Sequence, residues 1–536
     1  MDRPSRVARR PAARLAAALV VATSFLTGCD DSLPPLGEAL LIVDTDLPVP
    51  RLAARLRVDL YTLDGLEWYE SRDIALLDRR DWPVSFSLYV PDEDESRSAL
   101  VRLRVYPQGK VRDYRGERFA PISVGGDPAA LWVVPDPPEG ETPRLWRDGG
   151  DITPATEPQP TLAIDRLLVL HLEPGEVGSY EVVMRGTCSG TQADWAGRTT
   201  CVAVEASRRP APTADLDPDM DVPTTSRQGN FGGEVPCSAP TRPAGTAGDG
   251  TPLFDEEVCV SGGAFVFGNA DSLMPAQQTT EPERLALLPP FRFDRYEVSV
   301  ARWRDGVARG FVSPDQSPAV NDGGFPAETT DVDDLRWCTF STTLQGRETY
   351  PVTCVSWAAA RAFCQFEGGD LPTEAQWEYV AQATGRPAKT RYPWGNYAPT
   401  CEQAIYARNG TAAAQNNNAD WCYAPGNAGP APVDARAHPE GDVVASLGVA
   451  HLAGNVTEIV MDTHVPFNAQ CVIGASIQSP LCLLEGAHHP LFRGGDWSSS
   501  AEGTYLANRN GSTSAGPLAS IKPYSGFRCA RPGDAR

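Results

Sequence analysis

The sequence predicts an α+β protein in two parts: an all-β, sandwich-like domain, and then a larger domain with little regular secondary structure. Residues 38–205 hold short apolar or alternating stretches separated by turn-forming residues, the pattern of a β-sandwich. Residues 256–532 carry only three well-marked helix signals. The chain also has 48 glycines and 49 prolines, and such a turn-rich composition argues against a helical bundle or a coiled coil.

The N-terminus has the features of an export signal. Five arginines within residues 1–14 precede the apolar run Leu15–Leu26, which is followed by Thr27, Gly28 and Cys29. A charged start, a short apolar core and small residues before a processing site indicate a secretory signal. The ending resembles a bacterial lipobox, in which the cysteine becomes the acylated first residue; an ordinary signal peptide with an incidental cysteine is the alternative. We therefore expect a signal peptide over 1–28, lipidation at Cys29 and a tether over 29–37.

This N-terminus and the charge of the chain set its expected surroundings. The lipid would hold the body at a membrane of the bacterial cell envelope, periplasmic or on the outer surface. The formal net charge is −22, whereas nucleic-acid binding needs a basic face. We expect no nucleic-acid partner.

The predicted domains follow from pattern and composition. Apolar or alternating stretches in the first domain predict strands at 40–43, 56–61, 84–90, 100–106, 167–172 and 180–184. Residues 206–255 are rich in Pro, Gly, Asp, Thr and Ser, so we interpret them as a linker. The third segment, 256–532, forms the larger domain.

Three helices in that domain are predicted from their caps. Ser299 precedes the segment 300–309, and Ser356 precedes 357–366. Thr373 and Gln376 form a capping-box pattern that opens a helix over 374–384.

Cysteine usage agrees with export. Of 13 cysteines, 12 remain when Cys29 is set aside, an even number that fits an oxidising compartment. They fall into the sequential couples Cys188/Cys201, Cys237/Cys259, Cys338/Cys354, Cys401/Cys422 and Cys471/Cys482, with Cys364 and Cys529 left over. Local pairing is one of many connectivities. Since no C-x-x-C occurs, zinc ribbons and thioredoxin-like sites are disfavoured.

Blocks of the C-terminal half resemble the formylglycine-generating enzyme (sulfatase-modifying factor) family. They run in family order at 262–268 (GGAFVFG), 293–299 (FDRYEVS), 354–364 (CVSWAAARAFC), 370–379 (DLPTEAQWEY), 392–396 (YPWGN), 452–458 (LAGNVTE), 492–497 (FRGGDW) and 525–531 (SGFRCAR). The resemblance covers about half the chain and implies an α+β fold akin to C-type lectin-like scaffolds. A fold identifies a scaffold, and function must still be argued from a site.

The family's catalytic residues are missing. Catalytic members bind copper(I) through a cysteine pair shortly after the Gly-Gly-Ser-Tyr/Trp block, and oxygen then oxidises a substrate cysteine to formylglycine. Here no cysteine occurs between Cys482 and Cys529, and Ser499 and Thr504 stand where the thiolates would be. A hydroxyl is a hard ligand that does not replace a thiolate on copper(I), so copper is not expected. Asp496 also replaces the usual serine.

The resemblance also implies a disulfide and a calcium site. Family members pair the cysteines that correspond to Cys364 and Cys529. They also bind a structural calcium, for which Glu458 would give its carboxylate and Gly454 and Val456 their carbonyls. The first ligand position, normally Asn or Asp, is His451, which weakens this site because imidazole is a poor calcium ligand. A second family calcium site would fall within 405–425, where Arg408 stands near an expected Asn.

Two functions compete at this stage. The first is a noncatalytic binding or structural module that is lipid-anchored and recognises an unknown protein or glycan. The second is an oxidoreductase of the formylglycine-generating or nonheme-metal oxygenase family with an altered metal site. Related sulfoxide synthases take iron through an N-terminal His-x-x-x-His-x-Glu helix, but residues 30–437 hold a single histidine, His171. The absent thiolates favour the first function.

Overall fold

The computed structural model of the chain describes most of both predicted domains. The described residues are chiefly 37–61, 68–89, 96–107, 163–189, 234–269, 280–326, 331–386, 389–409, 426–484, 489–511 and 521–534, with a few shorter pieces between them and single gaps at 436 and 439. The predicted signal peptide, Cys29 and most of the tether lie outside the described residues. No helix in the described ranges is long and apolar enough to cross a membrane.

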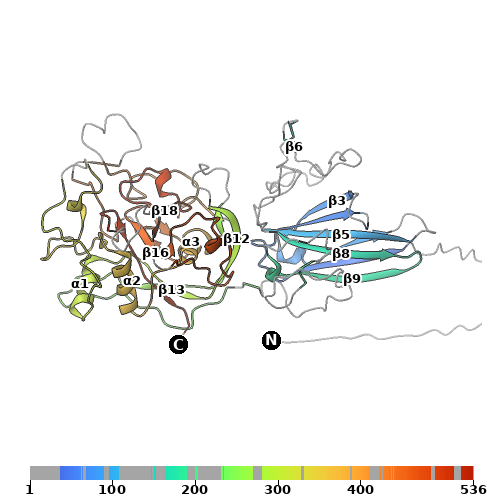
Figure 1. The fold of residues 1–536 in the computed structure, drawn as a ribbon, viewed down its shortest axis with the longest axis horizontal. Coiled ribbons are helices and arrows are strands. Elements are labelled where there is room, and N and C mark those ends of the chain that lie inside the picture. The colour runs from blue at the N-terminus through green and yellow to red at the C-terminus, as the bar shows by residue number, and fades with distance from the viewer. Residues whose placement is uncertain are drawn as a thin grey trace, which may run out of the picture.

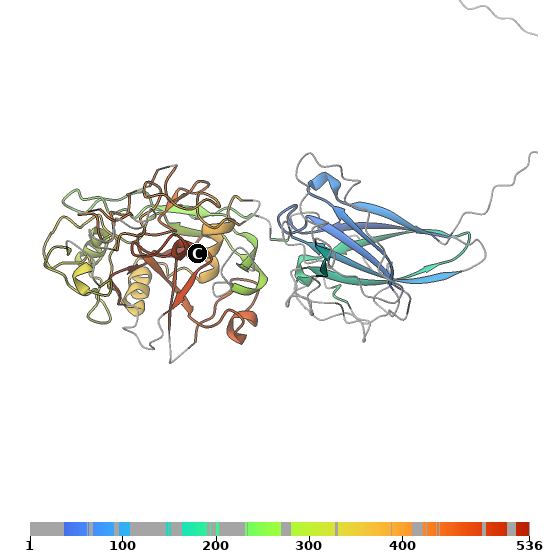
Figure 2. The ribbon, with the colours of Figure 1, turned by 90° about the horizontal axis from the view of Figure 1, so that it is seen from above.

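The N-terminal domain consists of two sheets that share one core (Figures 1 and 2). One sheet has the order β4-β1-β9 and the other β3-β2-β5-β8. In β1 every second residue is buried, including Leu41 and Val43. These side chains join Val101 and Leu103 of β5 in the core, since the pleat of a strand turns successive side chains to opposite faces of the sheet. The strands are β1 Glu38–Thr45, β2 Arg55–Tyr61, β3 Trp68–Ala75, β4 Val84–Tyr89, β5 Arg97–Tyr106, β8 Ile164–Leu172 and β9 Val177–Met184, with a short pair β6 Trp146–Arg147 and β7 Gly150–Asp151.

Six of these strands match the predicted stretches, apart from residue 90, which lies outside the described residues; β3 and the short pair β6 and β7 were not predicted. β3 is the longest of these three. Its sequence, WYESRDIA, lacks apolar alternation. It forms an edge strand through antiparallel pairing with β2, from Arg55 opposite Ala75 to Tyr61 opposite Trp68. Backbone pairing with a neighbouring strand defines this element, and that information is not local.

The C-terminal domain mixes short strands and helices among long loops. Its sheets are β10-β13-β20, β11-β12, β14-β15 and β18-β17-β16-β19. The strands are β10 Glu257–Val260, β11 Gly263–Asn269, β12 Thr280–Leu288, β13 Phe291–Asp294, β14 Val443–Val444, β15 Val449–Ala450, β16 Thr457–Thr463, β17 Pro490–Arg493, β18 Arg509–Gly511, β19 Ser525–Gly526 and β20 Ala530–Pro532. The helices are α1 Val300–Ala308, α2 Trp357–Phe366, α3 Glu374–Glu378 and α4 Gln470–Ile473.

The predicted caps are present. Ser299 Oγ accepts from Arg302 N at 3.0 Å, and Ser356 Oγ accepts from Ala359 N at 2.9 Å. Thr373 and Gln376 form the reciprocal capping box. Each side chain satisfies a backbone N–H that the first helical turn leaves without a partner.

The third helix departs from its prediction over 374–384. It is α-helical only over α3 and continues as a π-helical turn, Tyr379–Ala383. Thr384 closes this turn with two bonds to the Tyr379 carbonyl, from its N–H and from its hydroxyl, both at 2.9 Å. The wider turn is fully buried, so tertiary packing, rather than helix propensity, fixes it.

Residues 234–255, which the sequence assigned to the linker, lie against the C-terminal domain. Val235 N donates to Gly262 O at 3.1 Å, and Ser299 Oγ donates to Leu253 O at 2.8 Å. The disulfide Cys237–Cys259 ties this segment to β10. The C-terminal domain therefore includes residues upstream of 256.

The two domains touch through β11 and β12 (Figures 1 and 2). Ala264, Val266 and Leu285 join the sandwich core cluster. Arg51 of the sandwich donates from Nη2 to Ala264 O at 2.6 Å. The sandwich is therefore in direct apolar and polar contact with the domain that carries the family motifs.

Six disulfides join twelve cysteines: Cys188–Cys201, Cys237–Cys259, Cys338–Cys354, Cys364–Cys529, Cys401–Cys422 and Cys471–Cys482. The set consists of the five sequential couples and the pair that the resemblance implies. Such a number of disulfides indicates an exported protein.

Candidate functional site

The loop that replaces the family's copper-binding segment joins β17 to β18. It starts at Gly494 and Gly495, whose φ angles are 95° and 72°. A Cβ on Gly495 would lie 2.6 Å from Gly503 O, so only glycine fits this close approach. Trp497 is fully buried and packs against Trp337, with ring centroids 5.2 Å apart. The loop is thus anchored in the core by an indole and folded back on itself.

Ser499 and Thr504 lie in this one loop. A Cβ added to Gly503, the residue before Thr504, would be 2.9 Å from Ser499 Cβ. Ser499 Oγ accepts from Asp496 N at 3.1 Å, and Thr504 Oγ1 donates to Ala501 O at 2.9 Å. Both hydroxyls therefore take part in hydrogen bonds that shape the loop.

Asp496 organises the turn that follows Gly495. Its Oδ1 accepts from Ser498 N at 2.7 Å and from Ser498 Oγ at 2.6 Å. Burial raises the pKa of this carboxyl, although the hydrogen bonds from Ser498 and Ser499 oppose the rise. The side chain that replaces the usual serine thus acts as the acceptor at the start of a serine-rich turn.

A disulfide lies beside this loop. Ala407 N donates to Ser499 O at 2.9 Å, and Arg408 N donates to Trp497 O at 2.8 Å. The same segment is flanked by the disulfide Cys401–Cys422, which clusters with Ala501. Every cysteine in the described ranges belongs to one of the six disulfides, so these residues do not fit a copper(I) site, which requires free thiolates.

The predicted calcium turn lies directly beside this loop. Trp497 N donates to Asn455 O at 2.9 Å, and Asn455 N donates to Ile405 O at 2.8 Å. A Cβ on Gly454 would lie 2.5 Å from Ile405 O. Val456 is buried, and Glu458 lies at the second position of β16 with 1% of its surface exposed. The structure therefore brings Gly454, Val456 and Glu458 together with the Trp497 loop.

The Glu458 carboxylate already has hydrogen-bond donors. Arg528 donates to both of its oxygens, at 2.5 and 2.8 Å, and Trp377 Nε1 donates at 2.8 Å. No group of three or more His, Cys, Asp or Glu side chains within the described ranges could hold a metal ion. Calcium at this turn stays a prediction of the resemblance. Of the second predicted site, 405–425, residues 410–421 and 425 lie outside the described residues.

A buried ionic frame supports the loop, and the sequence analysis assigned it no role. Arg493, the residue before Gly494, donates to Glu374 Oε1 at 3.1 Å and to Glu378 Oε2 at 3.0 Å. It also donates to Leu506 O at 2.9 Å, which ties the two ends of the loop together. Lys389 completes the frame by donating to Glu378 Oε1 at 2.5 Å. The two glutamates are four residues apart after a capping box, a spacing that places both on one face of a helix.

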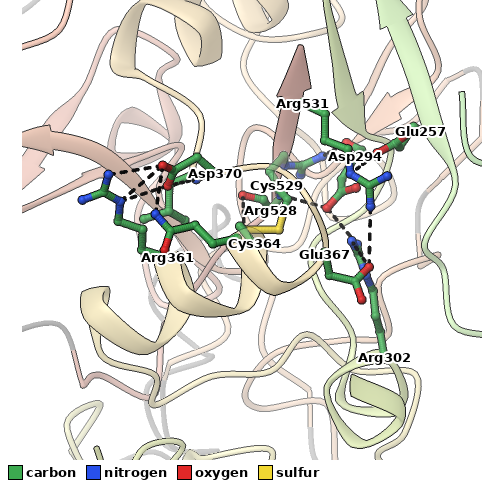
Figure 3. Close-up of a disulfide and its surroundings, with 12 residues drawn as sticks. Glu257, Asp294, Arg302, Arg361, Cys364, Glu367, Asp370, Arg528, Cys529 and Arg531 are labelled. Carbon is green, nitrogen blue, oxygen red and sulfur yellow. Dashed lines mark hydrogen bonds and ion pairs between the residues drawn. A yellow bond between two sulfur atoms is a disulfide. The ribbon is translucent and has the colours of Figure 1, made fainter. Parts of the chain in front are cut away.

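A second ionic cluster surrounds the disulfide that closes the domain (Figure 3). Asp294 Oδ2 accepts from Cys529 N at 2.8 Å and from Arg302 Nη1 at 2.7 Å. The Glu367 carboxylate forms ion pairs with Arg242, Arg302 and Arg309. Burial by itself raises the pKa of Glu367. The three guanidinium groups outweigh it, with the largest effect from Arg302, and lower the pKa to about 2. The cluster binds helix α2 to the C-terminal strand and is structural.

Fold and site define a formylglycine-generating-enzyme scaffold in which the metal-binding loop has no thiol. Residues 246–532, more than half of the chain, match the sulfatase-modifying factor enzyme 1-like domain. The chain belongs to this family.

Relatives of the domain include enzymes and an inactive protein. The chain is 30% identical to the formylglycine-generating enzyme of Thermomonospora curvata over 226 residues, which covers 38% of this chain and 70% of that one. It is 49% identical to the inactive C-alpha-formylglycine-generating enzyme 2 of Bos taurus over 47 residues, 9% and 15% of the two chains. It is 29% identical to hercynine oxygenase of Mycolicibacterium smegmatis over 170 residues, which cover 30% of this chain and 39% of that one.

Among solved structures, PvdO from Pseudomonas aeruginosa matches at 20% identity with a TM-score of 0.36. The match covers 55% of this chain and all of that one.

Proposed function

We propose that this protein is exported, tethered to a membrane by a lipid on Cys29, and uses its formylglycine-generating-enzyme-like domain as a noncatalytic binding or structural module. One observation carries the proposal: no cysteine lies between Cys482 and Cys529, the interval in which catalytic members place their copper ligands. Catalytic members need two thiolates there, and this chain offers Ser499 and Thr504.

The chemistry of the loop supports this assignment. Copper(I) is a soft ion that prefers thiolates, whereas hydroxyl oxygens are hard ligands that lose their protons only at high pH. The hydroxyls of Ser499 and Thr504 also take part in hydrogen bonds within the loop. The sulfurs of Cys401 and Cys422, which cluster with Ala501 of the loop, are held in a disulfide, and a reductant would have to open that bond before either atom could bind a metal.

A binding role fits the remaining features. The scaffold is akin to C-type lectin-like folds, which present long loops for recognition, and the chain adds a β-sandwich in contact with it. One relative of the domain is itself named inactive, so the scaffold occurs elsewhere without the activity. The partner we propose is a protein or a glycan at the cell envelope, and a nucleic acid is disfavoured by the charge of −22.

The test is metal content together with oxygen uptake. The mature protein is purified, its copper and iron are quantified, and oxygen consumption is followed with a cysteine-containing peptide. We expect neither stoichiometric metal nor peptide-dependent oxygen uptake. The double variant Ser499→Cys/Thr504→Cys, which restores thiols at the replaced positions, serves as the matched control and should bind copper(I).

The competing oxidoreductase function makes the opposite prediction. Wild-type protein that keeps stoichiometric copper or iron and consumes oxygen with the peptide would establish an altered metal site and overturn the proposal. If no oxidation is found, a glycan array is probed with the full-length protein. Binding to the array would indicate a glycan partner, and no binding would favour a protein partner.

A further inference from the structure

The first strand of the sandwich runs from the predicted tether to the junction with the C-terminal domain. β1 starts at Glu38, directly after the residues assigned to the tether, and ends at Thr45. The main-chain carbonyl of the next residue, Asp46, accepts from Phe231 N at 2.9 Å, and Phe231 shortly precedes the segment that lies against the C-terminal domain. At about 3.3 Å per residue, the 8 residues of β1 separate these two ends by about 26 Å.

The other strands of the sandwich follow the same axis. β9 is parallel to β1, from Glu38 opposite Val177 to Thr45 opposite Met184, and β4 is antiparallel to it. Figure 1 shows β5, β8 and β9 along the long axis of the molecule, with β12 of the C-terminal domain beside one end of them, and Figure 2 shows the same end-to-end arrangement. The sandwich therefore has a tether end and a junction end.

Phe231 and Gly232 form a clasp between the two domains. Phe231 N donates to the sandwich, at Asp46 O, while Gly232 O accepts from Ala264 N of β11 at 3.0 Å. A Cβ on Gly186, which follows β9, would lie 2.1 Å from Phe231 Cδ1, so the ring lies directly on that glycine. Gly232 has a φ of 62°, and a Cβ there would lie 2.2 Å from Ala264 Cβ. Each glycine thus permits one close approach, the first within the sandwich and the second at β11.

An apolar core shared by both domains surrounds the clasp. Phe231 packs against the sandwich core cluster, which also contains Val266 and Leu285 of the C-terminal domain. Asp46 Oδ1 accepts from Gly186 N at 2.7 Å and so fixes the backbone on which the ring lies. Domains in one chain move relative to each other unless a large, apolar interface holds them. Here the apolar side chains form one cluster, and backbone hydrogen bonds reach both domains.

We infer that the sandwich is a rigid strut that holds the formylglycine-generating-enzyme-like domain in one orientation, at the end away from the membrane, with Phe231 and Gly232 as the clasp. Which end faces the membrane rests on the lipid anchor of the proposed function, whereas the rigid joint does not. The end of the domain that carries α1 lies opposite the sandwich (Figure 1), so the strut presents that end to a partner.

The joint is tested by the distance between two spin labels in the unlipidated mature chain. Cys29→Ser removes the lipid site. Ser87→Cys in β4 and Val307→Cys in α1 then add one exposed label site to each domain. We expect one narrow distribution of distances between the labels.

Two variants open the clasp in this labelled chain. Gly186→Ala displaces the ring of Phe231, and Phe231→Ala removes it, so each should give a distribution roughly twice as wide. The matched control is Gly324→Ala, because a Cβ at Gly324 meets nothing within 4 Å, and it should leave the distribution unchanged. A broad distribution in the parent chain overturns the inference, and so does a narrow one that both clasp variants leave unchanged.

The orientation is tested with the lipidated protein on vesicles of phosphatidylethanolamine and phosphatidylglycerol that carry an acceptor dye on their headgroups. A donor dye at residue 87, opposite Leu40 near the start of β1, should transfer energy more efficiently than a donor at residue 307. Equal transfer from both positions overturns the orientation. Protein that does not bind the vesicles contradicts the lipid anchor, and with it the membrane-facing end, while the spin-label distances still decide the joint.

Discussion

The disulfide Cys364–Cys529 should be the largest covalent contribution to the stability of the C-terminal domain. It joins residues 165 apart, and both sulfurs lie in the core, with at most 1% of either residue exposed. A loop of this length is worth about 5 kcal/mol through the entropy of the unfolded chain. The bond Cys471–Cys482 lies in the same domain but spans only 11 residues, for which the same relation gives about 3 kcal/mol.

The assay is thermal and denaturant unfolding of two double variants, Cys364→Ala/Cys529→Ala and the matched control Cys471→Ala/Cys482→Ala. For a domain of about 290 residues, the first loss corresponds to a fall in Tm of about 8 °C and the second to about 5 °C. The reasoning is refuted if opening Cys364–Cys529 costs no more than opening Cys471–Cys482, because stability would then not follow the length of the closed loop.

Three further predictions concern the loop and its supports. Arg493→Met removes the cation that Glu374 and Glu378 share and leaves each carboxylate one cationic partner, Arg509 for Glu374 and Lys389 for Glu378. The free energy of unfolding should therefore fall by about 2–3 kcal/mol, whereas Lys522→Met, which removes an exposed partner of Asp333, should cost much less in the same urea titration. Gly495→Ala should destabilise more than Gly346→Ala: both glycines have φ near 72°, but a Cβ meets Gly503 O at 2.6 Å only at the first position, and equal losses would exclude a steric role for this approach. Burial raises the pKa of Asp442 to about 7, so the folded carboxyl keeps its proton where the unfolded one has lost it. Its contribution to stability should therefore fall by roughly 3 kcal/mol between pH 5 and pH 8, a difference that the neutral variant Asp442→Asn removes; a wild-type-like pH profile in that variant would contradict the assignment.

Local sequence patterns predicted the elements that depend on local interactions. The caps at Ser299, Ser356 and Thr373 are contacts across three residues, so the residue types at that spacing are sufficient to predict them. The apolar run 40–43 predicted β1, and in that strand Leu41 and Val43 face the shared core. The motif blocks predicted the family, and the missing cysteines followed from counting residues.

Other features could be identified only from the tertiary structure. Strand β3 forms by backbone hydrogen bonding to β2, and no local pattern within β3 itself indicates this pairing. The helix after Thr373 continues as a π-helical turn whose five residues are all buried. Nothing near Glu458 in the sequence indicates that residue 528 pairs with it, nor that Glu374 and Glu378 meet Arg493. The sequence by itself predicted an export signal, and it determined the helix caps and the absence of cysteine between Cys482 and Cys529, since these depend on residue identity and short spacing. The tertiary structure alone decided which buried charges meet, because a charge removed from water must find its partner wherever the folded chain brings one close.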